Sequence, residues 1–162
     1  MEDADILFGI YCPPHPQPLL SPEASEGYAK LRQAYDTCRE RIENSDADLI
    51  IVYSTTWPSI IGHQIQAHPE PEWVHVDDDF HYLGSMPYKF KMDVNFAECL
   101  RDSAKERGLH SRTIAYEGFP IDTGSVVALK LLNPDNRIPA CIVSSNMSVS
   151  YTHLRAHETC HN

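Results

Sequence analysis

The sequence lacks the cysteine pattern of a disulfide-stabilised or zinc-binding protein. Its five cysteines, at positions 12, 38, 99, 141 and 160, are odd in number and widely spaced, and none forms a CxxC pair. This spacing argues against a disulfide framework and a zinc knuckle, and it favours reduced thiols in the cytoplasm. Cysteines 12, 38, 99 and 141 lie in apolar segments, so we expect them to be inert core residues.

Basic clusters and long apolar runs are also lacking. Acidic residues outnumber basic ones 23 to 13, and the formal net charge is -10. This balance excludes the electrostatic footprint of a nucleic-acid-binding protein and a polybasic membrane-binding surface. No stretch approaches the roughly 18 apolar residues of a membrane span, and residues 1–5 lack the basic start of a secretory signal. The sequence therefore predicts a cytoplasmic protein with neither nucleic acid nor membrane as a partner.

The pattern that is present indicates one α/β domain within the 162 residues. Residues 6–12 form a short apolar run that predicts a buried first strand. Residues 48–54 contain the continuous apolar run 49–53, which is typical of a strand buried on both faces. Between them, Ser21 and Pro22 signal the start of an amphipathic helix that reaches about residue 44. We therefore expect a mostly parallel sheet with helices on both faces.

The second half of the chain continues the same alternation. Strands are predicted over residues 73–76, 112–116 and 139–144, and a helix over 94–107. Residues 124–132 predict a helix or an apolar segment. Residues 55–71 are irregular, with a short helix expected over 58–66.

Three segments follow predicted strands or precede a predicted helix at the same end of the sheet. They are residues 13–16, residues 54–58 and residues 119–124. In a parallel α/β sheet, ligands bind in the crevice beyond the carboxyl ends of the strands. The sequence therefore predicts a functional site where these three segments meet.

These segments also carry a resemblance to a known family. The strings PPHPQPLL, DLIIVYSTTW, WVHVDDDFHYLG, GFPIDTGSVVALKLL and IPACIVSSN follow one another over nearly all of residues 5–146. In order and spacing they resemble the class III extradiol ring-cleavage dioxygenases of LigB type. Within that family they are most similar to the alpha subunits of 2-aminophenol-cleaving enzymes. The resemblance implies a LigB-like α/β fold.

The family's chemistry uses Fe(II) held by two histidines and a glutamate, with a further histidine as acid or base. The resemblance places the first iron ligand at His15. The second iron-ligand position holds Thr56, and the active-site turn that is Asp-His-Gly in many members reads Asp122, Thr123 and Gly124. Threonine is a poor ligand for Fe(II), so one ligand position of three is filled.

The resemblance therefore implies the non-catalytic alpha-type chain of an extradiol dioxygenase. Such a chain pairs with a homologous subunit that carries Fe(II), and it binds no iron itself. The substrate would be a small aromatic of catechol or 2-aminophenol type. The iron glutamate and the acid/base histidine would lie beyond the segment that contains Asn146.

Two alternative functions remain open. One is a catalytic Fe(II) dioxygenase with a reorganised site that uses His15 and His63; the other is a non-catalytic interaction module. His75, the acidic residues 77–79 and His81 have the composition of a metal cluster, but we favour a solvated acidic loop. Tyr53, Trp57 and Phe119 suit either an aromatic pocket or ordinary core packing.

The last residues form a separate case. Residues 149–162 read VSYTHLRAHETCHN and resemble a translated sequencing-adapter read-through. We therefore expect a C-terminally truncated family domain over residues 1–148 and a non-native tail over 149–162, whose histidines we exclude from any metal site. Truncation predicts exposed apolar surface near residues 126–132 and 138–143.

Overall fold

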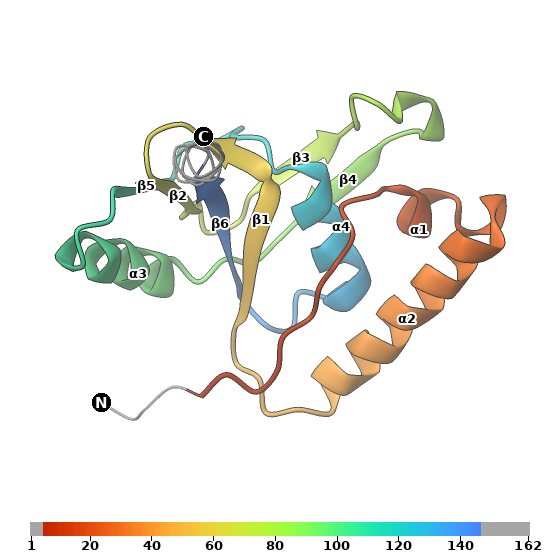
Figure 1. The fold of residues 1–162 in the computed structure, drawn as a ribbon, viewed down its shortest axis with the longest axis horizontal. Coiled ribbons are helices and arrows are strands. Elements are labelled where there is room, and N and C mark those ends of the chain that lie inside the picture. Colours follow the sequence, from red (N-terminus) through yellow and green to blue (C-terminus); the bar gives the residue numbers. More distant parts are fainter. Residues whose placement is uncertain (1–4, 147–162) are drawn as a thin grey trace, which may run out of the picture.

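The computed structural model describes residues 5–146, and its centre is a four-stranded sheet in the order β1-β6-β2-β5 (Figure 1). The strands are β1 (Ile50–Ser59), β6 (Ala140–Asn146), β2 (His63–Gln66) and β5 (Ser111–Ile114). β1 runs parallel to β6 and β2 runs parallel to β5, while β2 and β6 meet antiparallel through one pair of residues. The predicted mostly parallel sheet is confirmed.

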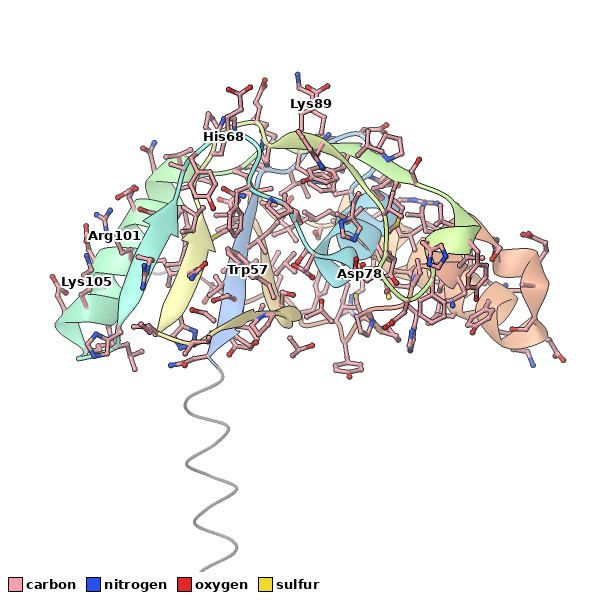
Figure 2. The ribbon with its side chains drawn as sticks, turned by 90° about the horizontal axis from the view of Figure 1, so that it is seen from above. Trp57, His68, Asp78, Lys89, Arg101 and Lys105 are labelled. Carbon is pink, nitrogen blue, oxygen red and sulfur yellow. The ribbon has the colours of Figure 1, made fainter. Side chains whose placement is uncertain are left out.

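Helices cover both faces of this sheet, as predicted. α2 (Glu26–Glu43) and α4 (Thr123–Leu132) pack on one face, and α3 (Val94–Glu106) packs on the other (Figures 1 and 2). The central strand β6 shows why both faces must be covered. Its Ile142 belongs to the core beside α2 and α4, whereas Cys141 and Val143 belong to the core beside α3. A strand buried on both sides needs this continuous apolar run.

Helix α2 begins four residues later than predicted. Ser21 makes no side-chain cap, and Pro22–Ala24 forms a separate 3-10 turn, η1, after the single turn α1 (Gln17–Leu20). The hydroxyl of Ser25 instead accepts a hydrogen bond from the backbone N–H of Tyr28 at 3.2 Å. A serine oxygen that satisfies a free N–H in the first turn is the usual way to start a helix.

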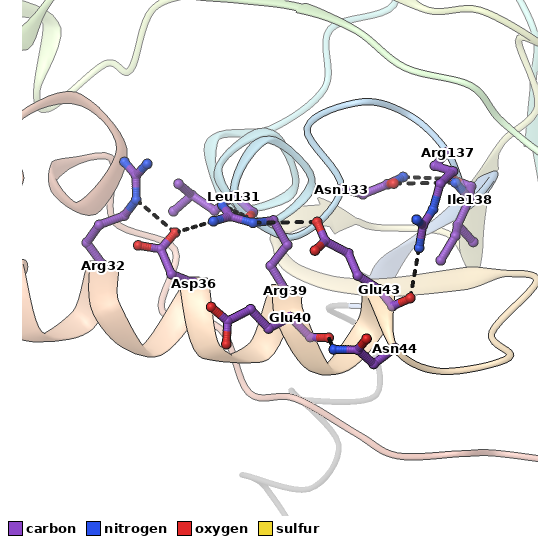
Figure 3. A network of polar contacts seen from close by, with 10 residues as sticks. All are labelled: Arg32, Asp36, Arg39, Glu40, Glu43, Asn44, Leu131, Asn133, Arg137 and Ile138. Carbon is purple, nitrogen blue, oxygen red and sulfur yellow. Dashed lines mark hydrogen bonds and ion pairs between the residues drawn. The ribbon is translucent and has the colours of Figure 1, made fainter.

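A line of charged residues ties α2 to the end of α4 (Figure 3). Asp36 pairs with both Arg32 and Arg39, at 3.5 and 2.9 Å. Arg39 also donates to the backbone carbonyl of Leu131 at 3.3 Å. The exposed ion pairs stabilise little by themselves, but the bond to Leu131 fixes α2 against α4.

A two-stranded hairpin lies beside the sheet. It consists of β3 (Glu72–His75) and β4 (Met86–Lys89), joined by a loop that contains the 3-10 turn η2 (His81–Leu83). Met86 and Tyr88 of β4 are buried in the core with α2 and α4. β3 agrees with the predicted strand to within one residue, whereas β4 was not predicted.

The predicted first strand is wrong. Residues 6–12 form no ladder, although Phe8 packs against the core and the Arg41 guanidinium lies 4.5 Å from the centre of its ring. Ile6 and Tyr11 are 93% and 90% exposed. An apolar run predicts burial, but a strand also requires a partner backbone, and nothing in residues 5–146 pairs with these residues.

The expected exposure of residues 126–132 and 138–143 is also wrong. All apolar residues of α4 are buried, because α4 lies between α2 and the sheet. Cys141 is fully buried in the central strand, and this burial raises the pKa of its thiol to about 12. Cys99, in contrast, is exposed rather than part of the core. The suspected tail at 149–162 lies outside the described residues.

The expected short helix over residues 58–66 does not form. β1 continues to Ser59, the chain turns through Gly62 with φ +70, and β2 begins at His63. A Cβ at position 62 would lie 2.1 Å from the carbonyl oxygen of His110. Both this clash and the positive φ require glycine at the turn. Among the helices of residues 5–146, none is both long and apolar enough to cross a bilayer.

Candidate functional site

The site begins at an irregularity in β1. Ser54 pairs with Ser144 of β6, but the next paired residue is Pro58, so residues 55–57 bulge out of the ladder. The hydroxyl oxygen of Ser54 accepts bonds from the backbone N–H groups of Thr56 (3.2 Å) and Trp57 (3.1 Å). Bulges of this kind are frequent beside active sites, where they redirect side chains. Here the bulge directs Thr56 towards the start of α4.

Asp122 receives the groups that the bulge presents. Its Oδ2 atom accepts hydrogen bonds from the hydroxyls of Ser54 at 2.8 Å and Thr56 at 2.5 Å. The same carboxylate caps α4, because it accepts from the backbone N–H of Ser125 at 3.0 Å and from the Ser125 hydroxyl at 2.8 Å. A carboxylate at a helix N-terminus is favoured electrostatically. Asp122 thus joins β1 to α4 at the end of the sheet.

Gly124 shows how closely the predicted segments approach. A Cβ on this residue would lie 2.7 Å from the Thr56 hydroxyl oxygen and 3.0 Å from Cβ of Pro14. Residues from all three predicted segments therefore meet at one point, as we expected from the strand ends. The close packing explains why this position has no side chain.

Thr123 connects the site to the hairpin. Its hydroxyl donates a short hydrogen bond to the Asp77 carboxylate, and its oxygen lies 2.7 Å from Nε2 of His75. Because the only hydroxyl proton goes to Asp77, His75 must donate its Nε2 proton to Thr123. The expectation of a solvated loop is wrong for His75 and Asp77, which belong to the site.

The surroundings of the Asp77 carboxylate favour its ionised form. Partial burial acts to raise its pKa, but hydrogen bonds from Thr123 and from the backbone of Phe80 and Asp79, together with nearby His75, outweigh that effect. The pKa of Asp77 therefore lies below its usual value. An ionised Asp77 is the form that accepts these hydrogen bonds.

His15 lies under the same loop but makes weaker contacts. It is exposed, and its ring meets Phe80 edge-on with centroids 6.3 Å apart. The backbone N–H of Phe80 donates to Asp77 Oδ1 at 2.9 Å. The loop after β3 therefore contacts both Thr123 and His15.

The other candidates lie in different surroundings. His63 is half-buried in β2, with Nδ1 3.0 Å from the carbonyl oxygen of Ser144 and its ring beside Tyr53. His63 is therefore a residue of the sheet. Trp57, the last residue of the bulge, packs against Phe119 with ring centroids 5.4 Å apart (Trp57 is labelled in Figure 2).

These residues do not fit an Fe(II) ion. Of the residues expected from the resemblance, His15 offers one imidazole, while Thr56 offers a neutral hydroxyl that already donates to Asp122. Within residues 5–146, no three histidine, cysteine, aspartate or glutamate side chains are grouped so as to hold a metal. Facial-triad iron sites need two histidines and a carboxylate around one open face. What these residues do offer is a set of hydroxyls arranged around two carboxylates, those of Asp77 and Asp122.

Comparison with known proteins identifies the class. The family described as "Catalytic LigB subunit of aromatic ring-opening dioxygenase" matches residues 9–161, and the chain belongs to this family.

Three individual proteins are also similar to the chain. The chain is 29% identical over 143 residues to the 2-aminophenol 1,6-dioxygenase alpha subunit of a Pseudomonas species, covering 88% of this chain and 52% of that protein. It is 26% identical over 159 residues to the beta subunit, covering 93% and 52%. It is 22% identical to Escherichia coli 3,4-dihydroxyphenylacetate 2,3-dioxygenase, covering 68% and 40%. The chain thus spans about half the length of the curated relatives it matches.

Proposed function

We propose that this chain is a subunit of an extradiol dioxygenase that cleaves catechol- or 2-aminophenol-type aromatics, and that it is the non-catalytic, alpha-type chain. In this assignment a homologous partner subunit carries Fe(II), and this chain binds none. The observation that carries the proposal is the bond from the Thr56 hydroxyl to Asp122 at 2.5 Å. The resemblance assigns Thr56 to the family's second iron-ligand position, and a hydroxyl engaged with Asp122 supports a structural role for this residue.

Thr123 supports the same assignment. In the resemblance to the family, its position belongs to an active-site histidine. Here its hydroxyl joins His75 to Asp77, and so holds the hairpin loop against α4. By this resemblance, hydroxyls that join neighbouring segments stand at both positions where the family has imidazoles. Such a hydrogen-bond network is suited to a rigid subunit rather than to oxygen chemistry.

The iron content of the purified chain tests the proposal. After anaerobic reconstitution with Fe(II) and desalting, we expect close to no iron per chain. His15→Ala should leave this value unchanged, as should the control His110→Ala at an exposed position. About one iron per chain that His15→Ala abolishes and His110→Ala does not would show that this chain is an enzyme in its own right.

The partner is tested by co-purification. We expect the tagged chain to retain an iron-bearing homologue, for which the 2-aminophenol 1,6-dioxygenase beta subunit is the available probe. Retention should leave ring cleavage dependent on the iron of the beta subunit. A chain that binds neither iron nor this homologue would instead be an interaction module.

A further inference from the structure

One face of the sheet is covered over β6 but bare over β1. Ile51 and Tyr53 of β1 are register partners of Cys141 and Val143 of β6, so all four lie on the same face. Cys141 is fully buried and Val143 is 9% exposed, because α3 covers them. Ile51 and Tyr53 are 56% and 58% exposed.

The gap arises from where α3 lies. This helix packs on β5, β2 and β6 and stops short of β1 (Figure 1). β1 is an edge strand in the order β1-β6-β2-β5, so its outer backbone groups also have no strand partner among residues 5–146. Edge strands with apolar side chains and free backbone groups readily pair with further strands.

The bare residues have the chemistry of a core rather than of a surface. On the opposite face of β1, Ile50 and Val52 pack against the core with α2 and α4. β1 is therefore apolar on both sides, as strands with helices on both faces are. A strand that ends an α/β sheet at the solvent normally has a polar side or a covering helix.

We propose that Ile51, Tyr53 and the free edge of β1 form a docking seam for the rest of a LigB domain. The occupant is a strand that pairs with β1 together with a helix that lies beside α3 over Ile51 and Tyr53. Two observations select this occupant. The relatives carry about as much chain again as this one matches, at 52% coverage of both aminophenol subunits. The bare strip also lies on the same face of the sheet that α3 covers over β6, so a helix there would continue the layer that α3 begins.

Cysteine labelling tests the seam. Ile51→Cys is made in the chain alone and in a hybrid in which residues 9–146 replace the matching part of the 2-aminophenol 1,6-dioxygenase alpha subunit. Maleimide labelling is followed peptide by peptide in the mass spectrometer, which separates the introduced thiol from the exposed Cys99. We expect the thiol introduced at position 51 to react at least tenfold more slowly in the hybrid. The matched control is Trp73→Cys on the hairpin, also 56% exposed, which should react equally in both proteins.

Equal labelling at position 51 in the two proteins would overturn the seam. So would an insoluble hybrid beside an isolated chain that is soluble and monomeric. A dimer of the isolated chain that Ile51→Lys dissociates and Trp73→Lys does not would overturn it in favour of a second copy as the occupant. None of these readouts involves iron or ring cleavage, so the seam stands or fails separately from the proposed function.

Discussion

Nε2 of His75 lies 2.7 Å from the hydroxyl oxygen of Thr123, although 48 residues separate them in the chain. The contact connects the end of β3 to the first residue of α4, and Asp77 completes it from the same loop. Because the Thr123 proton goes to Asp77, this pair also determines which nitrogen of His75 carries hydrogen. A hydroxyl at position 123 thus has a definite structural role.

Thr123→Val should release the hairpin loop. Valine keeps the shape of threonine but leaves His75 and Asp77 without their shared partner, so we expect a loss of about 1–2 kcal/mol in the free energy of unfolding. Urea denaturation measures the loss, and limited proteolysis within residues 76–85 should become faster.

Thr37→Val is the matched control, since the Thr37 hydroxyl bonds only to the Gln33 carbonyl within exposed α2. Equal stability changes in the two variants would mean that the contact between the hairpin and α4 stabilises nothing.

The contribution of Asp77 to the free energy of unfolding should depend on pH. The pKa of Asp77 is lower in the folded protein than in the unfolded chain, so its contribution is present above the unfolded value of about 3.9. This contribution should be lost as the pH falls through the pKa of Asp77 in the folded protein. The unfolded chain takes up the proton at a higher pH than the folded protein does. Folding at low pH then requires either the release of this proton or the loss of the hydrogen bonds. Asp77→Asn should therefore be less stable than the natural chain at pH 7, with the difference shrinking in acid.

Unfolding in urea at pH 7 and at about pH 3 measures this difference. Asp78→Asn, at a neighbouring exposed position, should show no such dependence. A stability difference for Asp77→Asn that stayed constant over this range would contradict the ionised role of Asp77.

Gly124→Ala should destabilise the protein although alanine favours helices. The new methyl group would meet the Thr56 hydroxyl and Pro14 at 2.7 and 3.0 Å, and overpacking of this kind costs about 1–3 kcal/mol. In a double-mutant cycle, Thr56→Ala should recover part of the loss, because it removes the nearer contact. Strictly additive effects would mean that the three segments do not meet at this glycine.

The sequence predicts the layers of this fold well because they depend on local patterns. Residues 48–54 and 139–144 each contain a continuous apolar run, and both become strands, although β1 extends to Ser59 and β6 to Asn146. Residues 6–12 show the same pattern without becoming a strand, since periodicity detects burial but not the presence of a pairing partner. β4 escaped prediction because four residues that include Pro87 carry too little signal.

The candidate site was likewise predicted only in part. The meeting of residues 13–16, 54–58 and 119–124 follows from where strands end in a parallel sheet. The roles of His75 and Asp77 do not, because an acidic stretch reads as a solvated loop until a distant threonine is placed beside it. The bulge at residues 55–57 was equally hidden, because it arises from a register shift against β6.

Asp122 offers the sharpest test of whether its bonds to Ser54 and Thr56 stabilise the fold. Asp122→Ala removes the cap of α4, worth about 1 kcal/mol, and also leaves the buried Ser54 hydroxyl without its acceptor, worth about 1–3 kcal/mol more. Asp93→Ala is the matched control, because Asp93 caps α3 through the N–H of Phe96 at 2.9 Å and accepts no hydroxyl.

We therefore expect urea denaturation to show a loss of about 2–4 kcal/mol for Asp122→Ala and about 1 kcal/mol for Asp93→Ala. The larger loss would show that Ser54 and Thr56 stabilise the fold through Asp122. Equal losses would reduce Asp122 to an ordinary helix cap. Thr56 would then be free of a structural duty, and the argument for a non-catalytic chain would lose its main support.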